Sequence, residues 1–133
     1  YKYISSKNFK TKIAIGETIK NLKDAKKLAS FGNNLLQPDS NLIPLDEIVK
    51  ISKLYKNREI ILHNWSFPIS MLSNFHLAAC INQIKLVEYS TIEVNIKNSV
   101  LNRKLDIKDG YFYHNNKPGL GWILDENKLN KLI

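Results

Sequence analysis

The sequence predicts an α/β domain built on a parallel sheet, and three observations support this. Four short runs of apolar, often β-branched residues follow one another along the chain. A stretch with helical periodicity separates each run from the next, and the runs recur at nearly equal intervals. Such alternation is typical of parallel strands buried on both faces. Four units of this kind form either a small doubly wound domain or half of a (β/α)8 barrel, and periodicity does not distinguish the two.

The individual elements follow from local signals. Asn21 precedes apolar positions at helical spacing and is a common helix-capping residue type, and Gly32 is a typical helix stop. Pro44 suits the first turn of the second helix, which is expected to begin there or at Leu45. The expected strands are residues 12–17, 34–39, 59–64 and 84–89, and the expected helices are 22–31, 45–54 and about 69–81.

The pattern changes after Ser90. No helical period is visible in the next stretch. Asp109 and Gly110 form a strong hairpin signal between residues 105–107 and residues 111–113. The end of the chain is therefore expected to contain a β-hairpin rather than a fifth strand–helix unit.

Length and composition narrow the function classes. The chain has 133 residues, enough for one ordinary domain, whereas a complete barrel needs roughly 250. The net charge is +8, yet only Arg58 and Arg103 among the 20 basic residues are arginines. Nucleic-acid recognition depends heavily on arginine, and a chain rich in Lys, Asn and Ile is typical of an AT-rich genome. We therefore expect no nucleic-acid partner and interpret the lysines as solvated helix surface.

The cysteine content and the hydropathy of the sequence indicate the cellular compartment that we expect for the protein. Cys80 is the one cysteine, which excludes an internal disulfide and a multi-cysteine metal site. No run of about 18 apolar residues predicts a transmembrane helix, and the start of the sequence lacks the apolar region of a signal peptide. We expect a cytoplasmic protein without a membrane partner, in which Cys80 is a small core residue.

Each of the four runs ends on a polar residue of a type found in catalytic sites. Because the carboxyl ends of parallel strands meet at one edge of a sheet, these side chains are expected to lie together. A glutamate offers hard oxygen ligands for Mg²⁺, and a histidine whose imidazole is held by a carboxylate can take and give a proton. The residues are Glu17, Asp39, His63 and Glu88, at intervals of 22, 24 and 25 residues.

These residues and their surroundings resemble the C-terminal part of the mandelate racemase/muconate lactonizing group of the enolase superfamily. The matching stretches occur in the family's order and spacing over most of the chain, from about Thr11 to Asp125. They are residues 13–17, 36–39, 63–70, 86–89, 109–111 and 118–121.

The resemblance implies a specific architecture. The four runs would be strands five to eight of a (β/α)8 TIM-type barrel, so residues 1–93 would hold the last four β/α units and the catalytic strand ends. Residues 94–133 would return to pack on an N-terminal capping domain that lies outside this chain. Asp125 is expected to cap a short last helix that runs through Leu132.

The resemblance also implies roles for the strand-end residues. His63 resembles the catalytic base, Asp39 its dyad partner and Glu17 the third metal-binding carboxylate. Glu88 resembles the carboxylate that binds the substrate's carboxylate region, and Trp65 either walls the substrate pocket or packs structurally. The family removes a proton next to a carboxylate through an enediolate, with Mg²⁺ as the cofactor.

The expected protein is therefore a Mg²⁺-dependent enzyme acting on a small hydroxy-carboxylate, either a racemase or, preferably, a sugar-acid dehydratase. In its complete form it is expected to be a homo-oligomer. By the same resemblance, the remaining metal ligands and a Lys-x-Lys base motif lie outside this chain. The family's usual Gly-Gly pair after the second strand is replaced here by residues 40–45. The alternatives are an inactive or partner-dependent barrel fragment and a small basic α/β binding module.

Overall fold

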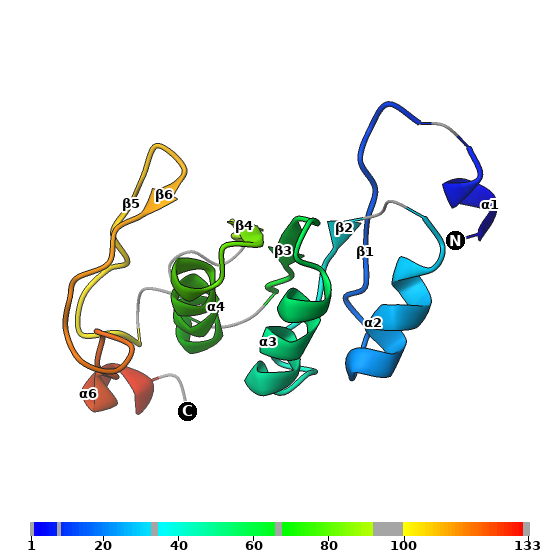
Figure 1. The fold of residues 1–133 in the computed structure, drawn as a ribbon. Coiled ribbons are helices and arrows are strands. Elements are labelled where there is room, and N and C mark those ends of the chain that lie inside the picture. Colours follow the sequence, from blue (N-terminus) through cyan, green and yellow to red (C-terminus); the bar gives the residue numbers. More distant parts are fainter. Residues whose placement is uncertain (1, 8, 33–34, 66–67, 92–99, 132–133) are drawn as a thin grey trace.

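The computed structural model describes residues 2–7, 9–32, 35–65, 68–91 and 100–131 (Figure 1). The expected boundary between residues 93 and 94, and the expected helix end at Leu132, lie outside these ranges. Within them, no helix combines the length and the apolar character that a bilayer crossing requires.

The sheet has four parallel strands in the order β1-β2-β3-β4. A doubly wound sheet reverses its strand order at a switch point, whereas this sheet runs straight through in chain order. The order therefore rules out the doubly wound alternative and agrees with half of a barrel. The strands are β1 (Ala14–Ile15), β2 (Leu35–Leu36), β3 (Ile60–Leu62) and β4 (Ile84–Val87).

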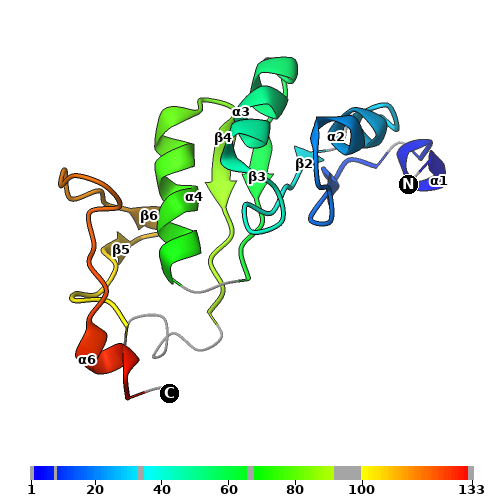
Figure 2. The same ribbon diagram turned by 90° about the horizontal axis from the view of Figure 1, so that it is seen from below.

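Three helices connect the strands: α2 (Leu22–Ala29), α3 (Leu45–Leu54) and α4 (Pro68–Cys80). Right-handed crossovers that all advance in one direction place their helices on one face of the sheet. Figures 1 and 2 both show α4 between α3 and the C-terminal segment. The expected cap of α2 is present, since the Asn21 side chain accepts from the Asp24 N–H. Helix α3 begins at Leu45, one of the two expected starts, directly after Pro44.

The core lies between the sheet and these helices. Side chains that alternate along the strands point toward the helices and are almost fully buried, as are those facing them from α3. The members of this core include Ile15, Leu36, Ile60, Leu62, Ile48 and Ile51.

The opposite side of the sheet, here called the open face, is formed by Ala14, Leu35, Ile61 and Leu86. These are the strand residues that alternate with the buried ones, and the register pairs Ala14 with Leu35 and Ile61 with Leu86. No helix of the described chain covers them, and Leu86 is 63% exposed. The open face is therefore an apolar surface that this chain leaves uncovered.

The C-terminal segment forms a second, smaller core against α4. Its hairpin consists of β5 (Ile107–Lys108) and β6 (Tyr111–Phe112), joined by Asp109 and Gly110, which both have positive φ as a type I′ turn requires. The Phe112 ring stacks on Phe75 of α4 with centroids 4.2 Å apart. Packing on a capping domain stays a prediction.

Three features differ from, or add to, the sequence-based expectations. Cys80 is exposed rather than buried, because Ala78 packs on the core and a residue two positions later lies about 200° around the helix. A short helix α1 (Lys2–Ser5) was not expected. The last helix, α6 (Glu126–Leu129), begins after its expected cap Asp125.

Candidate active site

Backbone pairing continues past the strands and places three site residues side by side. Asp39 and His63 form a parallel bridge beyond β2 and β3, and the His63 N–H donates to the Pro38 carbonyl at 3.0 Å. The Glu88 N–H donates to the Leu62 carbonyl at 2.9 Å. The ladder therefore fixes these residues at the carboxyl-terminal edge of the sheet, where ligands bind in barrels and in open α/β sheets.

Glu17 reaches the same edge through a bend at Gly16. The φ of Gly16 is +123°, a value that side chains disfavour and glycine tolerates. The chain thus turns directly after β1, and the Glu17 carboxylate comes to lie 3.3 Å from His63 Nε2. The Gly-Glu pair in the sequence is the local signal for this turn.

His63 is the centre of the arrangement. Its Nδ1 lies 3.0 Å from Asp39 Oδ2, and its Nε2 lies 3.6 Å from Glu88 Oε2 as well as close to Glu17. An ionised carboxylate only accepts hydrogen bonds, so the imidazole donates from Nδ1 to Asp39. In the neutral ring, this tautomer leaves the lone pair on Nε2, directed at the space between the two glutamates.

The Asp39 carboxylate has hydrogen-bond partners on both of its oxygens. Its Oδ1 accepts hydrogen bonds from the Asn41 backbone N–H at 2.8 Å and from Asn41 Nδ2 at 2.7 Å. The two carboxylate oxygens therefore serve different partners. Sequence reasoning did not single out Asn41, although an Asp two residues before an Asn is a common turn signal.

Exposure separates the dyad from the two glutamates. The side chains of His63 and Asp39 are 16% and 11% exposed, whereas those of Glu17 and Glu88 are 63% and 42% exposed. The imidazole and its partner are thus sheltered, and the glutamates extend toward solvent. The structure brings the four predicted side chains together at one edge, and their chemical roles stay predictions.

A small cavity adjoins the site on the β4 side. Its volume is about 220 Å³, and its lining includes Trp65, Glu88 and Tyr89. Trp65 is 67% exposed, which is unusual for so large an apolar ring and agrees with a pocket wall better than with internal packing. The Glu88 carboxylate is fixed at this cavity by the Asn64 N–H, which donates to Oε2 at 3.1 Å.

The negative charge of the cluster would favour a bound cation, but the described residues do not form a complete metal site. Three carboxylates lie within 3.6 Å of one imidazole, and carboxylate oxygens are the ligands that Mg²⁺ prefers. Among the residues that the structure describes, no group of three or more His, Cys, Asp or Glu side chains is placed to hold a metal ion. The metal-binding role expected of Glu17 therefore stays a prediction.

Two buried asparagines near the site were missed in the sequence. Asn64 follows the histidine, and Asn74 lies on α4, where its Nδ2 donates to the His63 carbonyl at 3.2 Å. Both are fully buried. A lone amide among apolar helix positions is the signal that could have identified Asn74.

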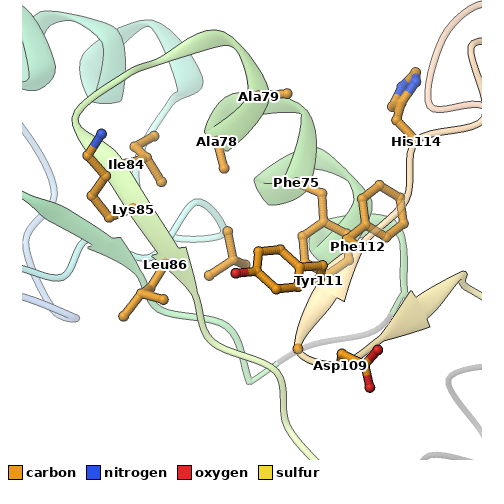
Figure 3. A pocket seen from close by; sticks show the side chains of 12 residues that line it. Phe75, Ala78, Ala79, Ile84, Lys85, Leu86, Asp109, Tyr111, Phe112 and His114 are labelled. Atoms are coloured by element: carbon orange, nitrogen blue, oxygen red, sulfur yellow. The ribbon is translucent and has the colours of Figure 1, made fainter.

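A second, larger cavity lies away from the site. It has a volume of about 600 Å³ and is formed between α4, β4 and the hairpin, with Phe75, Leu86 and Tyr111 among the lining side chains (Figure 3). None of the four strand-end residues lines it. His114 lines this cavity and contacts His76 edge to face, so both histidines are separate from His63.

Several solved structures share this architecture. The chain matches a mandelate racemase/muconate lactonizing enzyme from Jannaschia sp. CCS1 with a TM-score of 0.81 and 21% identity, over 92% of this chain and 32% of that one. A protein from Mesorhizobium loti, provisionally named a dehydratase, matches with a TM-score of 0.85 and 24% identity, over 98% and 36%. An enolase from Agrobacterium radiobacter, provisionally named a galactarate dehydratase and holding sodium and L-malate, gives 0.76 and 23%, over 89% and 34%.

These likenesses concern the fold, since the identities are low, and the chain spans about a third of the length of each structure. A search of curated proteins gives no match. The sequence itself matches the family model described as "Enolase C-terminal domain-like" over residues 1–128. The half-barrel order of the strands and this match over nearly the whole sequence lead to one conclusion: the chain belongs to the enolase C-terminal domain-like family.

Proposed function

We propose that this chain is the catalytic half of an enzyme that removes the proton next to the carboxylate of a small hydroxy acid, as a sugar-acid dehydratase. The observation that carries the proposal is His63, an imidazole held at Nδ1 by Asp39 and facing two glutamates with Nε2. In this reading the four strands are strands five to eight of the barrel.

His63 acts as the general base. Its Nε2 takes the proton from the carbon next to the substrate carboxylate, and the electron pair moves into the carboxylate to form an enediolate. Asp39 keeps the imidazole in the tautomer that can accept this proton and stabilises the imidazolium that results. The electron pair then expels a hydroxyl group from the neighbouring carbon, the imidazolium gives its proton to that group, and water leaves.

Mg²⁺ is the cofactor that the family implies, and Glu17 is the residue of this chain that would bind it. When bound, the ion would offset the negative charge that develops on the substrate carboxylate. Glu17 is suited to this role because its carboxylate is exposed and lies at the same edge as the base. The remaining ligands would come from outside this chain.

Glu88 and Trp65 would contact the substrate. The Glu88 carboxylate accepts a hydrogen bond from a backbone N–H and borders the small cavity, so it can bind a substrate hydroxyl group or a protonated oxygen there. The exposed ring of Trp65 can pack against the carbon chain of a polyhydroxy acid.

Dehydration is preferred over racemisation because one histidine can perform both of its proton transfers. The names given to the Mesorhizobium loti and Agrobacterium radiobacter proteins also support a dehydratase.

A partner-dependent fragment is the second candidate, and the open face favours it. A parallel sheet is normally covered on both sides, yet Leu86 on this face is 63% exposed. Activity would then require a partner, or another part of the protein, that covers the open face and completes the metal site.

Isotope exchange tests the proposal. The full-length protein that carries this sequence is incubated in D₂O with Mg²⁺ and a panel of sugar acids, and substrate deuteration and 2-keto acid formation are followed by NMR. We expect Mg²⁺-dependent formation of a keto acid that stops when a chelator is added. Formation at an unchanged rate with the chelator would contradict the metal role, and neither exchange nor product with any hydroxy acid would contradict the enzyme.

A further inference from the structure

Two amide side chains are buried directly behind the site at a cost in stability. Asn64 and Asn74 are 0% exposed. Neither polar atom of the Asn64 side chain, nor Asn74 Oδ1, has a hydrogen-bond partner in the described structure. Each such unpaired buried group lowers the stability of the fold, and an apolar side chain of similar volume would avoid this cost. A reason other than stability is therefore needed for an amide at these positions.

The contacts of Asn74 indicate that reason. Its Nδ2 donates to the carbonyl oxygen of His63 at 3.2 Å. The N–H of Asn64 belongs to the same peptide group and donates to Glu88 Oε2 at 3.1 Å. The His63–Asn64 peptide is thus hydrogen-bonded through its carbonyl to a side chain of α4 and through its N–H to the carboxylate that follows β4.

We propose that Asn74 is a positioning residue, which fixes the orientation of the His63–Asn64 peptide and through it the placement of the Glu88 carboxylate. The inference rests on the proposed function only where it concerns turnover. Asn74 holds the carbonyl side of this peptide, so we expect the peptide to rotate more freely without it. The Asn64 N–H would then move away from Glu88, and that carboxylate would lose its fixed position beside Nε2 of His63.

The test replaces Asn74 in the full-length protein with an apolar residue of similar volume, Asn74→Leu, and records the Asn64 amide resonance by NMR. A hydrogen bond to a carboxylate shifts an amide proton downfield and slows its exchange. We expect the substitution to move this resonance upfield and to speed its exchange about tenfold or more, without lowering the melting temperature. Glu88→Gln is expected to move the same resonance.

Ser73→Ala provides the matched control. Ser73 neighbours Asn74 on α4, and its hydroxyl donates to the Ile69 carbonyl of the same helix, away from the site. It should leave the Asn64 resonance unchanged. If Asn74→Leu does not fold, Asn74→Ala lacks the donor without adding bulk or charge, and the same upfield shift is expected.

Turnover gives a second readout. If the proposed function holds, Asn74→Leu should lower kcat about tenfold. An unshifted Asn64 resonance in a folded Asn74 variant would overturn the inference while leaving the proposed function intact. A shifted resonance in a protein without any Mg²⁺-dependent activity would support the role of Asn74 in orienting the His63–Asn64 peptide and would contradict the proposed catalytic function.

Discussion

The two faces of the sheet differ in what they do. On the helix-covered face, side chains such as Leu36, Ile60 and Leu62 are almost completely buried in one continuous core. On the open face the alternating residues end in exposed Leu86, and the site residues Asp39 and His63 extend the same face beyond the strands. The comparison teaches that one face supplies the stability of this chain, whereas the other leads to the residues that we propose for its chemistry.

The largest expected effect is on turnover and comes from His63, beyond the strand end of the open face. Replacing His63 by alanine removes the only imidazole that the structure places at the site, so turnover should fall by about 10³-fold while the melting temperature stays unchanged. Steady-state rates and thermal melts check this. As a control, His114→Ala removes an exposed histidine outside the site and should retain the wild-type rate. Wild-type turnover in His63→Ala would contradict the role of His63 as the base.

The next effect compares one leucine from each face. Leu62→Ala on the covered face should lower the free energy of unfolding by about 2–5 kcal/mol, because it leaves a cavity in the core. Leu86→Ala on the open face should change it by less than about 0.5 kcal/mol in this chain. Urea unfolding measures both. Equal losses would show that Leu86 is covered in solution, by another copy or by another part of the protein.

A smaller effect tests the dyad. Asp39→Asn retains the shape of the side chain, but it removes the charge that stabilises the imidazolium, so turnover should fall about 10- to 100-fold. The loss should be mainly in kcat, since Asp39 contacts the histidine rather than the cavity beside Glu88. A change confined to KM would contradict the dyad role.

The smallest effect concerns the solvent side of α3, away from both faces. Lys50 bonds Asp46 and Glu47, and this contact lowers the pKa of both carboxyl groups and raises the pKa of Lys50. A carboxyl group whose pKa is lowered by folding stabilises the fold above its unfolded pKa, so the contribution fades as the pH falls below about 4.

Lys50→Met should therefore lower the melting temperature slightly at pH 7 and leave it unchanged at pH 2. The two melts form their own control. A decrease of equal size at both values would show that the contribution comes from the alkyl chain of Lys50 and not from its charge.

Local signals account for most of what the sequence could predict. Asn21, the Asp109-Gly110 turn and Asp125 each act through their own backbone neighbourhood, and all three are found where they were expected. The strand ends were predictable for a different reason, because near-equal spacing with parallel strands brings them to one edge whatever the details of packing.

Features that depend on contacts across the fold could not be predicted from periodicity and composition, and the half barrel was expected from the family resemblance alone. The strand order, which decides between a doubly wound sheet and a half barrel, is a property of pairing between distant segments. The exposure of Cys80 depends on which side of α4 meets the sheet. Asn74 was missed because its partner, the His63 carbonyl, is a backbone atom that no residue pattern reveals.

The contacts of Asp39 have a consequence for how the loop after β2 can change. One carboxylate oxygen lies against His63 Nδ1, the other accepts from Asn41, and the Asp39 carbonyl accepts from the N–H groups of Leu42 and Ile43. The loop after β2 and the Asp39–His63 pair are therefore structurally coupled. We expect insertions or deletions in residues 40–43 to turn the imidazole of His63 as well as to reshape the loop. The loop after β3, which carries Trp65, can therefore change with fewer consequences for His63.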